Sequence, residues 1–191
     1  MIPDSTGDGY LVGQLLIAMP MMEDPRFARS VIYMCAHSAD GAMGLVVNKE
    51  LESLSFSELL EQVGIDGPPS DDQILIHFGG PVEASRGFVL HTADYDQGGT
   101  MAVDDDFAFT ASIDILREIA NGTGPQRSLL ALGYAGWGPG QLDAEIQANG
   151  WLHAPSDPAL VFDTAIDAKW QSAIATLGID ANMLTSQAGH A

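Results

Sequence analysis

Residues 128–151, SLLALGYAGWGPGQLDAEIQANGW, constrain the fold of this chain more than any other segment. They begin with an unbroken apolar run, residues 129–132, which is short enough for a buried strand. Residues 133–140 contain four glycines and predict a turn, after which Leu142 and Ile146 are spaced as on one face of a helix. Gly150 stands where a helix commonly ends. A strand, a glycine turn and a helix build either a ligand site of an α/β protein or a tight structural corner.

The rest of the chain alternates strand-like and helix-like segments. The pattern predicts about eight or nine strands and about four helices. Residues 31–36 and 43–47 are close enough to form a hairpin, and residues 160–162 resemble a short strand. This interleaving indicates a layered α/β domain with a mixed sheet and a smaller α+β portion.

Helix ends are predicted from caps and glycines. Ser55 or Ser57 can begin a helix that Gly64 ends, and Ser112 can cap a helix over residues 112–121. A last helix carries Ile166, Trp170 and Ile174 at helical spacing, so we expect these three side chains to be mostly buried.

The chain is of a length typical of one domain. We expect that domain to cover residues 10–184, between a frayed start, residues 1–9, and a small, polar tail, residues 185–191.

Charge and cysteine content narrow the classes of function. The chain has 7 Lys and Arg against 26 Asp and Glu, for a formal net charge of -19, which repels nucleic-acid phosphates and anionic lipid. The sequence has no helix-turn-helix pattern with a basic second helix, so we expect no direct nucleic-acid binding. Cys35 is the only cysteine, which excludes an intrachain disulfide and agrees with a reducing compartment.

Hydropathy predicts the location of the protein. The sequence shows no secretory leader and no apolar run of the roughly 20 residues that a membrane span needs. We therefore expect a soluble, cytoplasmic protein without a membrane partner.

Several motifs in a fixed order carry a resemblance to a known family. They are residues 24–31 (DPRFARSV), 44–49 (GLVVNK), 79–82 (GGPV), 87–91 (GFVLH), 112–116 (SIDIL), 133–137 (GYAGW) and 140–142 (GQL) followed by Glu145. Asp143, after the GQL step, is a minor departure from the family pattern. With these motifs the chain resembles the AlgH/YqgE family of bacterial proteins over nearly its full length. The resemblance implies a compact three-layer α/β sandwich with a smaller plait-like element. It also brings a regulatory label that some members carry, but no catalytic residues.

The predicted ligand-binding residues combine two glycine segments with polar and aromatic neighbours. Glycines permit a close backbone approach, and an arginine beside them can hold a carboxylate. The pattern favours a structural explanation for each feature: each glycine segment as a turn, Trp137 as a core residue, and each cation as the partner of an acid. The predicted residues are Asn48, Gly79, Gly80, Arg86, His91, Gly136, Trp137 and Gly140.

Two classes of function remain after these exclusions. The first is a non-catalytic binding or regulatory protein that recognises a small molecule or a protein through the two glycine segments, Asn48 and Trp137. The second is a small-molecule enzyme that uses Asn48, His91 and Asp114, which requires these side chains to line one pocket with mutual hydrogen bonds. No metal-ligand spacing or cofactor motif is present in the sequence, so we expect no metal and no cofactor.

The glycine turn also makes a backbone prediction. If residues 133–140 form a tight corner, at least one of Gly133, Gly136 and Gly140 has a positive φ.

Overall fold

A single long strand, β8 (Ser128–Trp137), organises the fold. The computed structural model describes residues 10–66 and 74–188. In it β8 pairs with β4 (Ile76–Phe78), with β5 (Val82–Thr92) and, through its last residues, with β3 (Gly41–Val46). The prediction that the strand ends at residue 132 is therefore wrong, because the chain turns only after Trp137.

The pairing of β5 with β8 is interrupted by a bulge opposite Gly133. Val82 of β5 pairs with Tyr134 and Gly87 pairs with Leu132, so residues 83–86 of β5 loop out opposite Gly133. Gly133 has φ 75°, and Gly140 has φ 72°, which confirms the predicted positive φ. A glycine inside a strand often marks a bulge, and here the glycine at residue 133 belongs to one rather than to a turn.

The strands form one mixed sheet of order β6-β7-β5-β8-β3-β2-β1-β9, with β4 beside β8. The strands not yet named are β1 (Gln14–Ala18), β2 (Val31–Ser38), β6 (Thr100–Ala102), β7 (Phe107–Thr110) and β9 (Trp151–Pro155). The pairing of β4 with β8 is parallel and the other pairs are antiparallel, and β2 and β3 form the predicted hairpin. The mixed α/β class is confirmed, and the sheet curls; the three-layer arrangement stays a prediction.

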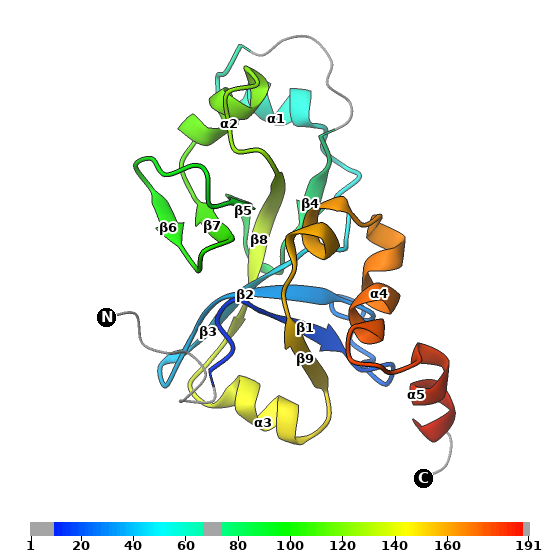
Figure 1. Cartoon of the computed structure of the whole chain (residues 1–191). Helices are drawn as coiled ribbons and strands as arrows, with labels where there is room; N and C mark the ends of the chain where they lie inside the picture. The colour runs from blue at the N-terminus through cyan, green and yellow to red at the C-terminus, as the bar shows by residue number, and fades with distance from the viewer. Residues whose placement is uncertain (1–9, 67–73, 189–191) are drawn as a thin grey trace.

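The helices lie on both sides of the long strand (Figure 1). Helices α1 (Phe56–Gln62) and α2 (Asp114–Ala120) lie beyond one end of β8, and α3 (Gln141–Gln147) follows its other end. A π-helical turn η1 (Ala159–Asp163), a 3-10 turn η2 (Ile166–Ala168), α4 (Lys169–Ala175) and α5 (Ala181–Ala188) complete the chain. None of the described helices is long and apolar enough to cross a membrane.

Of the two helix caps predicted at Ser55 and Ser112, one is confirmed and the other is wrong. The hydroxyl of Ser55 accepts a hydrogen bond from the Glu58 amide at 3.1 Å, as expected for a cap. Ser112 does not cap α2, since Ile113 precedes that helix and the buried Ser112 hydroxyl has no partner. Residues 160–162 are helical rather than a strand.

The end of the chain is more helical than expected. Helix α5 includes residues 185–188 of the predicted tail, and its start is stabilised by the Asp180 carboxylate, which accepts from the Asn182 amide. The predicted frayed residues 1–9, and residues 189–191 of the tail, lie outside the described residues.

Strand β1 contributes to two apolar clusters because both of its faces are covered. Leu15 and Ile17 pack into a cluster with Trp170 and Ile174 of α4, whereas Leu16 and Ala18 pack into a second cluster with Leu142 of α3. Trp170 and Ile174 are buried as predicted, but Ile166 is only half-buried. A third cluster lies between α1, α2 and the strands β4, β5 and β8.

Candidate functional site

The two glycine segments meet at a backbone crossing beside β8. The Gly79 amide donates to the Leu132 carbonyl at 2.8 Å, and the Gly79 carbonyl accepts from the Val46 amide at 2.8 Å. A Cβ atom on Gly79, Gly80 or Gly133 would lie within 3.0 Å of the opposite backbone. The space that these glycines leave is therefore filled by the chain itself, so Gly79 and Gly80 shape the site without lining an open pocket.

Asn48 clamps a strained turn. Its Oδ1 accepts from the Val31 amide at 2.8 Å and its Nδ2 donates to the Arg29 carbonyl at 2.8 Å, where Arg29 has φ 55°. Asn48 lines a separate small hollow with Arg29 and Lys49. Both sides of its amide serve the fold.

His91 is enclosed in the core. Its Nδ1 donates to the Thr92 carbonyl, since a carbonyl only accepts, and its Nε2 accepts from the Thr110 hydroxyl, both at 2.8 Å. The side chain is fully buried, and burial lowers its pKa. His91 is thus a neutral core histidine.

Asn48, His91 and Asp114 do not form a hydrogen-bonded group in the described part of the chain. Asp114 is exposed on α2 and pairs with Arg117 at 3.3 Å. Each of the three side chains has its own partners, and none of the described cavities is lined by two of them. The condition for the enzyme hypothesis is not met by these contacts.

A large groove brings together other predicted residues. It has a volume of about 660 Å³ and is formed by β2, β3, β5, β6, β7 and β8. We call it the methionine groove; its apolar wall consists of Met43, Val82, Phe88, Met101, Phe109, Tyr134 and Trp137, and its charged lining residues are Asp40, Glu83 and Arg86. The predicted residues Arg86, Gly136 and Trp137 all line this groove.

Trp137 anchors the groove to the core. It is 7% exposed, and its ring meets that of Trp151 edge to face at 6.1 Å. The remaining apolar surface is more open: Met101 is 60% exposed and Val82 is 36% exposed. Gly140, by contrast, lies beyond the groove, at the start of α3.

The bulge in β5 places charges at the groove. Glu83 has φ 46°, an uncommon conformation for a residue with a side chain, and it begins the looped-out segment 83–86. Arg86, which ends the segment, pairs with Glu83 at 3.3 Å and lies over the Phe88 ring at 5.1 Å. The bulge thus exposes an ion pair beside the apolar wall.

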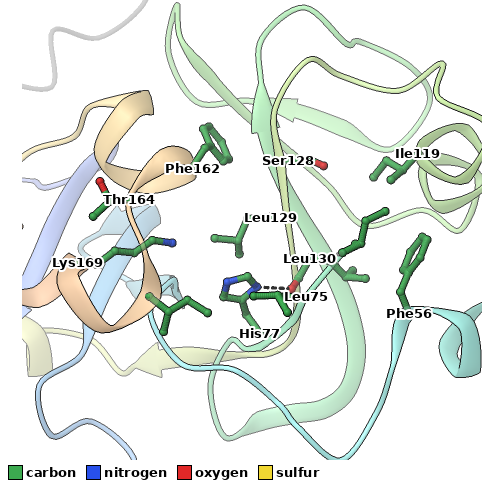
Figure 2. A pocket seen from close by; sticks show the side chains of 12 residues that line it. Phe56, Leu75, His77, Ile119, Ser128, Leu129, Leu130, Phe162, Thr164 and Lys169 are labelled. Atoms are coloured by element: carbon green, nitrogen blue, oxygen red, sulfur yellow. Dashed lines mark hydrogen bonds between the residues drawn. The ribbon is translucent and has the colours of Figure 1, made fainter. Parts of the chain in front are cut away.

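A second cavity, of about 250 Å³, lies between α4, β4 and β8 (Figure 2). We call it the lysine cavity because Lys169, which is 3% exposed, reaches into it from α4 (Figure 2). The Lys169 amine donates to the Val47 carbonyl at 2.8 Å, and burial lowers its pKa to about 8.

His77 lies in the same cavity. Its Nδ1 donates to the Leu130 carbonyl at 3.2 Å. Burial, together with the charge of Lys169, lowers the pKa of His77 to about 4, so its ring is neutral near pH 7.

Sequence reasoning missed Lys169. It lies three residues after Ile166 and four before Ala173, which is the spacing of the apolar face predicted for the helix that contains α4. A lysine at such a position is a signal that the pattern contained, because lysine is almost never fully buried without a partner.

Comparisons with known proteins agree with this fold. The family model described as AlgH-like matches residues 15–182. A UPF0301 protein of Rhodospirillum rubrum is 55% identical over 184 residues, with 96% of each chain covered. Another UPF0301 protein, from Jannaschia sp., is 55% identical over 192 residues, with 100% of this chain and 99% of that one covered.

Solved structures extend the likeness. The solution structure of the AlgH protein from Pseudomonas aeruginosa is 46% identical with a TM-score of 0.79 and covers 96% of this chain and 97% of its own. A crystal structure of a Corynebacterium diphtheriae protein shares the fold at 23% identity, with a TM-score of 0.69 over 86% of this chain and 85% of that one. Since the family model matches most of the chain, and relatives aligned over nearly their full length are more than 50% identical to it, the chain belongs to the AlgH-like family.

Proposed function

We propose that this protein is a non-catalytic binding protein that holds a basic, apolar segment of a partner protein in the methionine groove. The observation that carries the proposal is a groove of about 660 Å³, walled by methionines and aromatic rings, on a chain with a formal net charge of -19. A regulatory role follows if occupancy of the groove changes what the partner does.

The groove wall suits an apolar segment of variable sequence. Met43 and Met101 line it, and methionine adapts its shape to different side chains because it is unbranched and polarizable. The volume lies within the range of ligand sites, and the exposed Met101 leaves apolar surface uncovered in the free protein.

Charge favours a basic partner. Among the described residues, Asp40 and Glu83 line the groove with a single cation, Arg86, which is already paired with Glu83. The field of an acidic chain attracts lysine and arginine side chains and speeds their encounter, and salt screens this attraction.

The predicted site residues take distinct roles in this proposal. Trp137 provides a rigid apolar floor and Arg86 holds Glu83 in place, while the crossing at Gly79 and Gly80 fixes β8 beneath the groove. His91 bonds to Thr110, which lies between two groove residues, whereas Asn48 stabilises backbone away from the groove.

Two labelled synthetic peptides of equal length test the proposal, one of lysine and leucine and one of glutamate and leucine, with fluorescence anisotropy at low and high salt. We expect the basic peptide to bind, with an affinity that falls as the salt concentration rises, and the acidic peptide not to bind. M101D should weaken the basic peptide about tenfold, because it removes the burial of one large apolar side chain.

The control variant is M21D. Met21 is 63% exposed and does not line the groove, so M21D adds the same charge elsewhere. Non-specific attraction to an acidic protein predicts equal or tighter binding in both variants. Equal affinities of M101D, M21D and the unmodified chain would therefore refute the groove as the binding site.

A further inference from the structure

The lysine cavity is chemically unusual for this chain. The sequence contains two lysines, Lys49 and Lys169, and one of them is buried in a cavity. No carboxylate oxygen among the described residues lies within 4.0 Å of the Lys169 amine, although the chain has 26 acids. The ion pairs found among the described residues are made by arginines and a histidine.

The walls of the cavity favour an uncharged amine. Phe56, Ile119, Leu129 and Phe162 are among the side chains that surround it. Taking an ammonium group out of water without a counter-charge is expensive, which lowers the pKa of Lys169 to about 8. A neutral amine has a free electron pair and is a nucleophile.

A hydrogen bond to the backbone fixes the position of the Lys169 amine. One N–H of Lys169 donates to the Val47 carbonyl at 2.8 Å. The side chain of Lys169 extends from α4 toward the ring of His77 (Figure 2). A positioned, desolvated amine beside open volume is the arrangement that imine-forming lysines use.

We propose that Lys169 binds a small aldehyde or ketone in the lysine cavity through a reversible imine. This site is independent of the methionine groove, since the two cavities have no lining residue in common. The volume of about 250 Å³ restricts the ligand to a small molecule.

The step balances without any redox partner. The nitrogen electron pair of Lys169 forms a bond to the carbonyl carbon, and the nitrogen loses a proton to solvent while the carbonyl oxygen takes one up, which gives a carbinolamine. The carbinolamine oxygen then takes a second proton from solvent and leaves as water as the carbon–oxygen bond breaks. The nitrogen electron pair forms the double bond to carbon, and one hydrogen remains on the nitrogen. When protonated, the imine retains one N–H, which can still donate to the Val47 carbonyl.

His77 keeps a second charge out of the cavity. Its ring is neutral near pH 7, so it does not compete with the protonated imine for the limited stabilisation that the cavity offers. The mouth of the cavity lies beside Leu75, which is 39% exposed, and beside the exposed Ser128, so that water can enter and leave.

Reductive trapping tests the proposal on the intact protein. The protein is incubated near pH 7 with propanal and cyanoborohydride, which reduces an imine to a stable secondary amine, and peptide mapping by mass spectrometry compares the two lysines. Burial lowers the pKa of both amines, but only Lys169 shows a large shift, so a larger fraction of its amine is neutral and we expect Lys169 to be labelled about tenfold faster than Lys49. The rate at Lys169 should level off above about pH 8.

A bulky probe and two variants serve as controls. Pyrenecarboxaldehyde exceeds the cavity, so it should label Lys49 but not Lys169. K169R keeps a donor for the Val47 carbonyl but forms no imine, whereas K49R should leave labelling of Lys169 unchanged.

Either of two results overturns the proposal. One is labelling of Lys49 at the same rate as Lys169 or faster in the folded protein. The other is equal labelling of Lys169 by propanal and by the bulky aldehyde, which would show an open surface amine. Both readouts are taken on the unmodified chain, so a variant that fails to fold does not affect the outcome.

Discussion

Replacing Gly133 with alanine tests whether the backbone crossing holds the fold together. Gly133 has φ 75°, a conformation that costs an alanine about 1–2 kcal/mol. A Cβ there would also lie within 3.0 Å of the Gly80 carbonyl oxygen, and relieving such backbone overlap costs about 1–3 kcal/mol. The sum, about 2–5 kcal/mol, is a large part of the roughly 5–15 kcal/mol that stabilises a typical domain.

Two further variants separate the two contributions. Gly178 has φ 73° with no atom within 4 Å of a Cβ, so G178A carries only the backbone conformation. A Cβ on Gly79, whose φ is not in the left-handed region, would meet the Gly133 carbonyl, so G79A carries only the overlap. All three variants lose similar freedom in the unfolded state, so their differences report the folded state.

Urea unfolding followed by circular dichroism measures these differences. We expect the free energy of unfolding to fall by about 1–2 kcal/mol in G178A, by about 1–3 kcal/mol in G79A, and by the most, about 2–5 kcal/mol, in G133A. If G133A loses no more stability than G178A, the crossing yields to a side chain without strain and the reasoning is wrong.

Three other predictions concern single side chains. The pKa of Lys169 is about 8 in the folded protein and about 10.5 when unfolded, so below pH 8 its buried charge lowers stability. Between pH 8 and 10.5 the folded state loses this proton before the unfolded state does, so the free energy of unfolding of the unmodified chain should rise by up to about 3 kcal/mol relative to K169M. Urea unfolding at each pH measures the difference. N48A leaves the Val31 amide without its acceptor, whereas water can replace the donor to the exposed Arg29 carbonyl, so the unfolding free energy in urea should fall by about 1–3 kcal/mol; no measurable loss would mean that the clamp is unimportant. S55A should lower the melting temperature, since a lost cap costs about 1 kcal/mol, whereas S112A should be neutral or stabilising because its hydroxyl has no partner; equal shifts in calorimetry would contradict this contrast.

Local signals were the part of the fold that could be predicted. The hydroxyl of Ser55 and the glycine at residue 64 mark the two ends of α1, and both act within a few residues of their own position. The hairpin of β2 and β3 was equally accessible, because its turn lies between residues 38 and 41. The course of β8 was not, since Gly133 is explained by Gly80, a residue far from it in the sequence.

The site divides in the same way. Arg86, Gly136 and Trp137 were predicted from the two glycine segments and their neighbours, and these three residues line one groove. His91 was a plausible ligand until the structure placed Thr110 on its Nε2. A sequence shows that a histidine follows an apolar run, but not which hydroxyl the sheet brings opposite it.

The order in which the chain emerges from the ribosome has a consequence for β8. Strands β3 and β5 each need β8, residues 128–137, as one of their two neighbours in the sheet. Strand β1 pairs with β9, which is made later still. A nascent chain that stops before residue 128 therefore presents bare sheet edges and apolar faces with nothing to cover them. Truncation just before β8 should give a species that aggregates or recruits chaperones, while extension through α4 restores solubility.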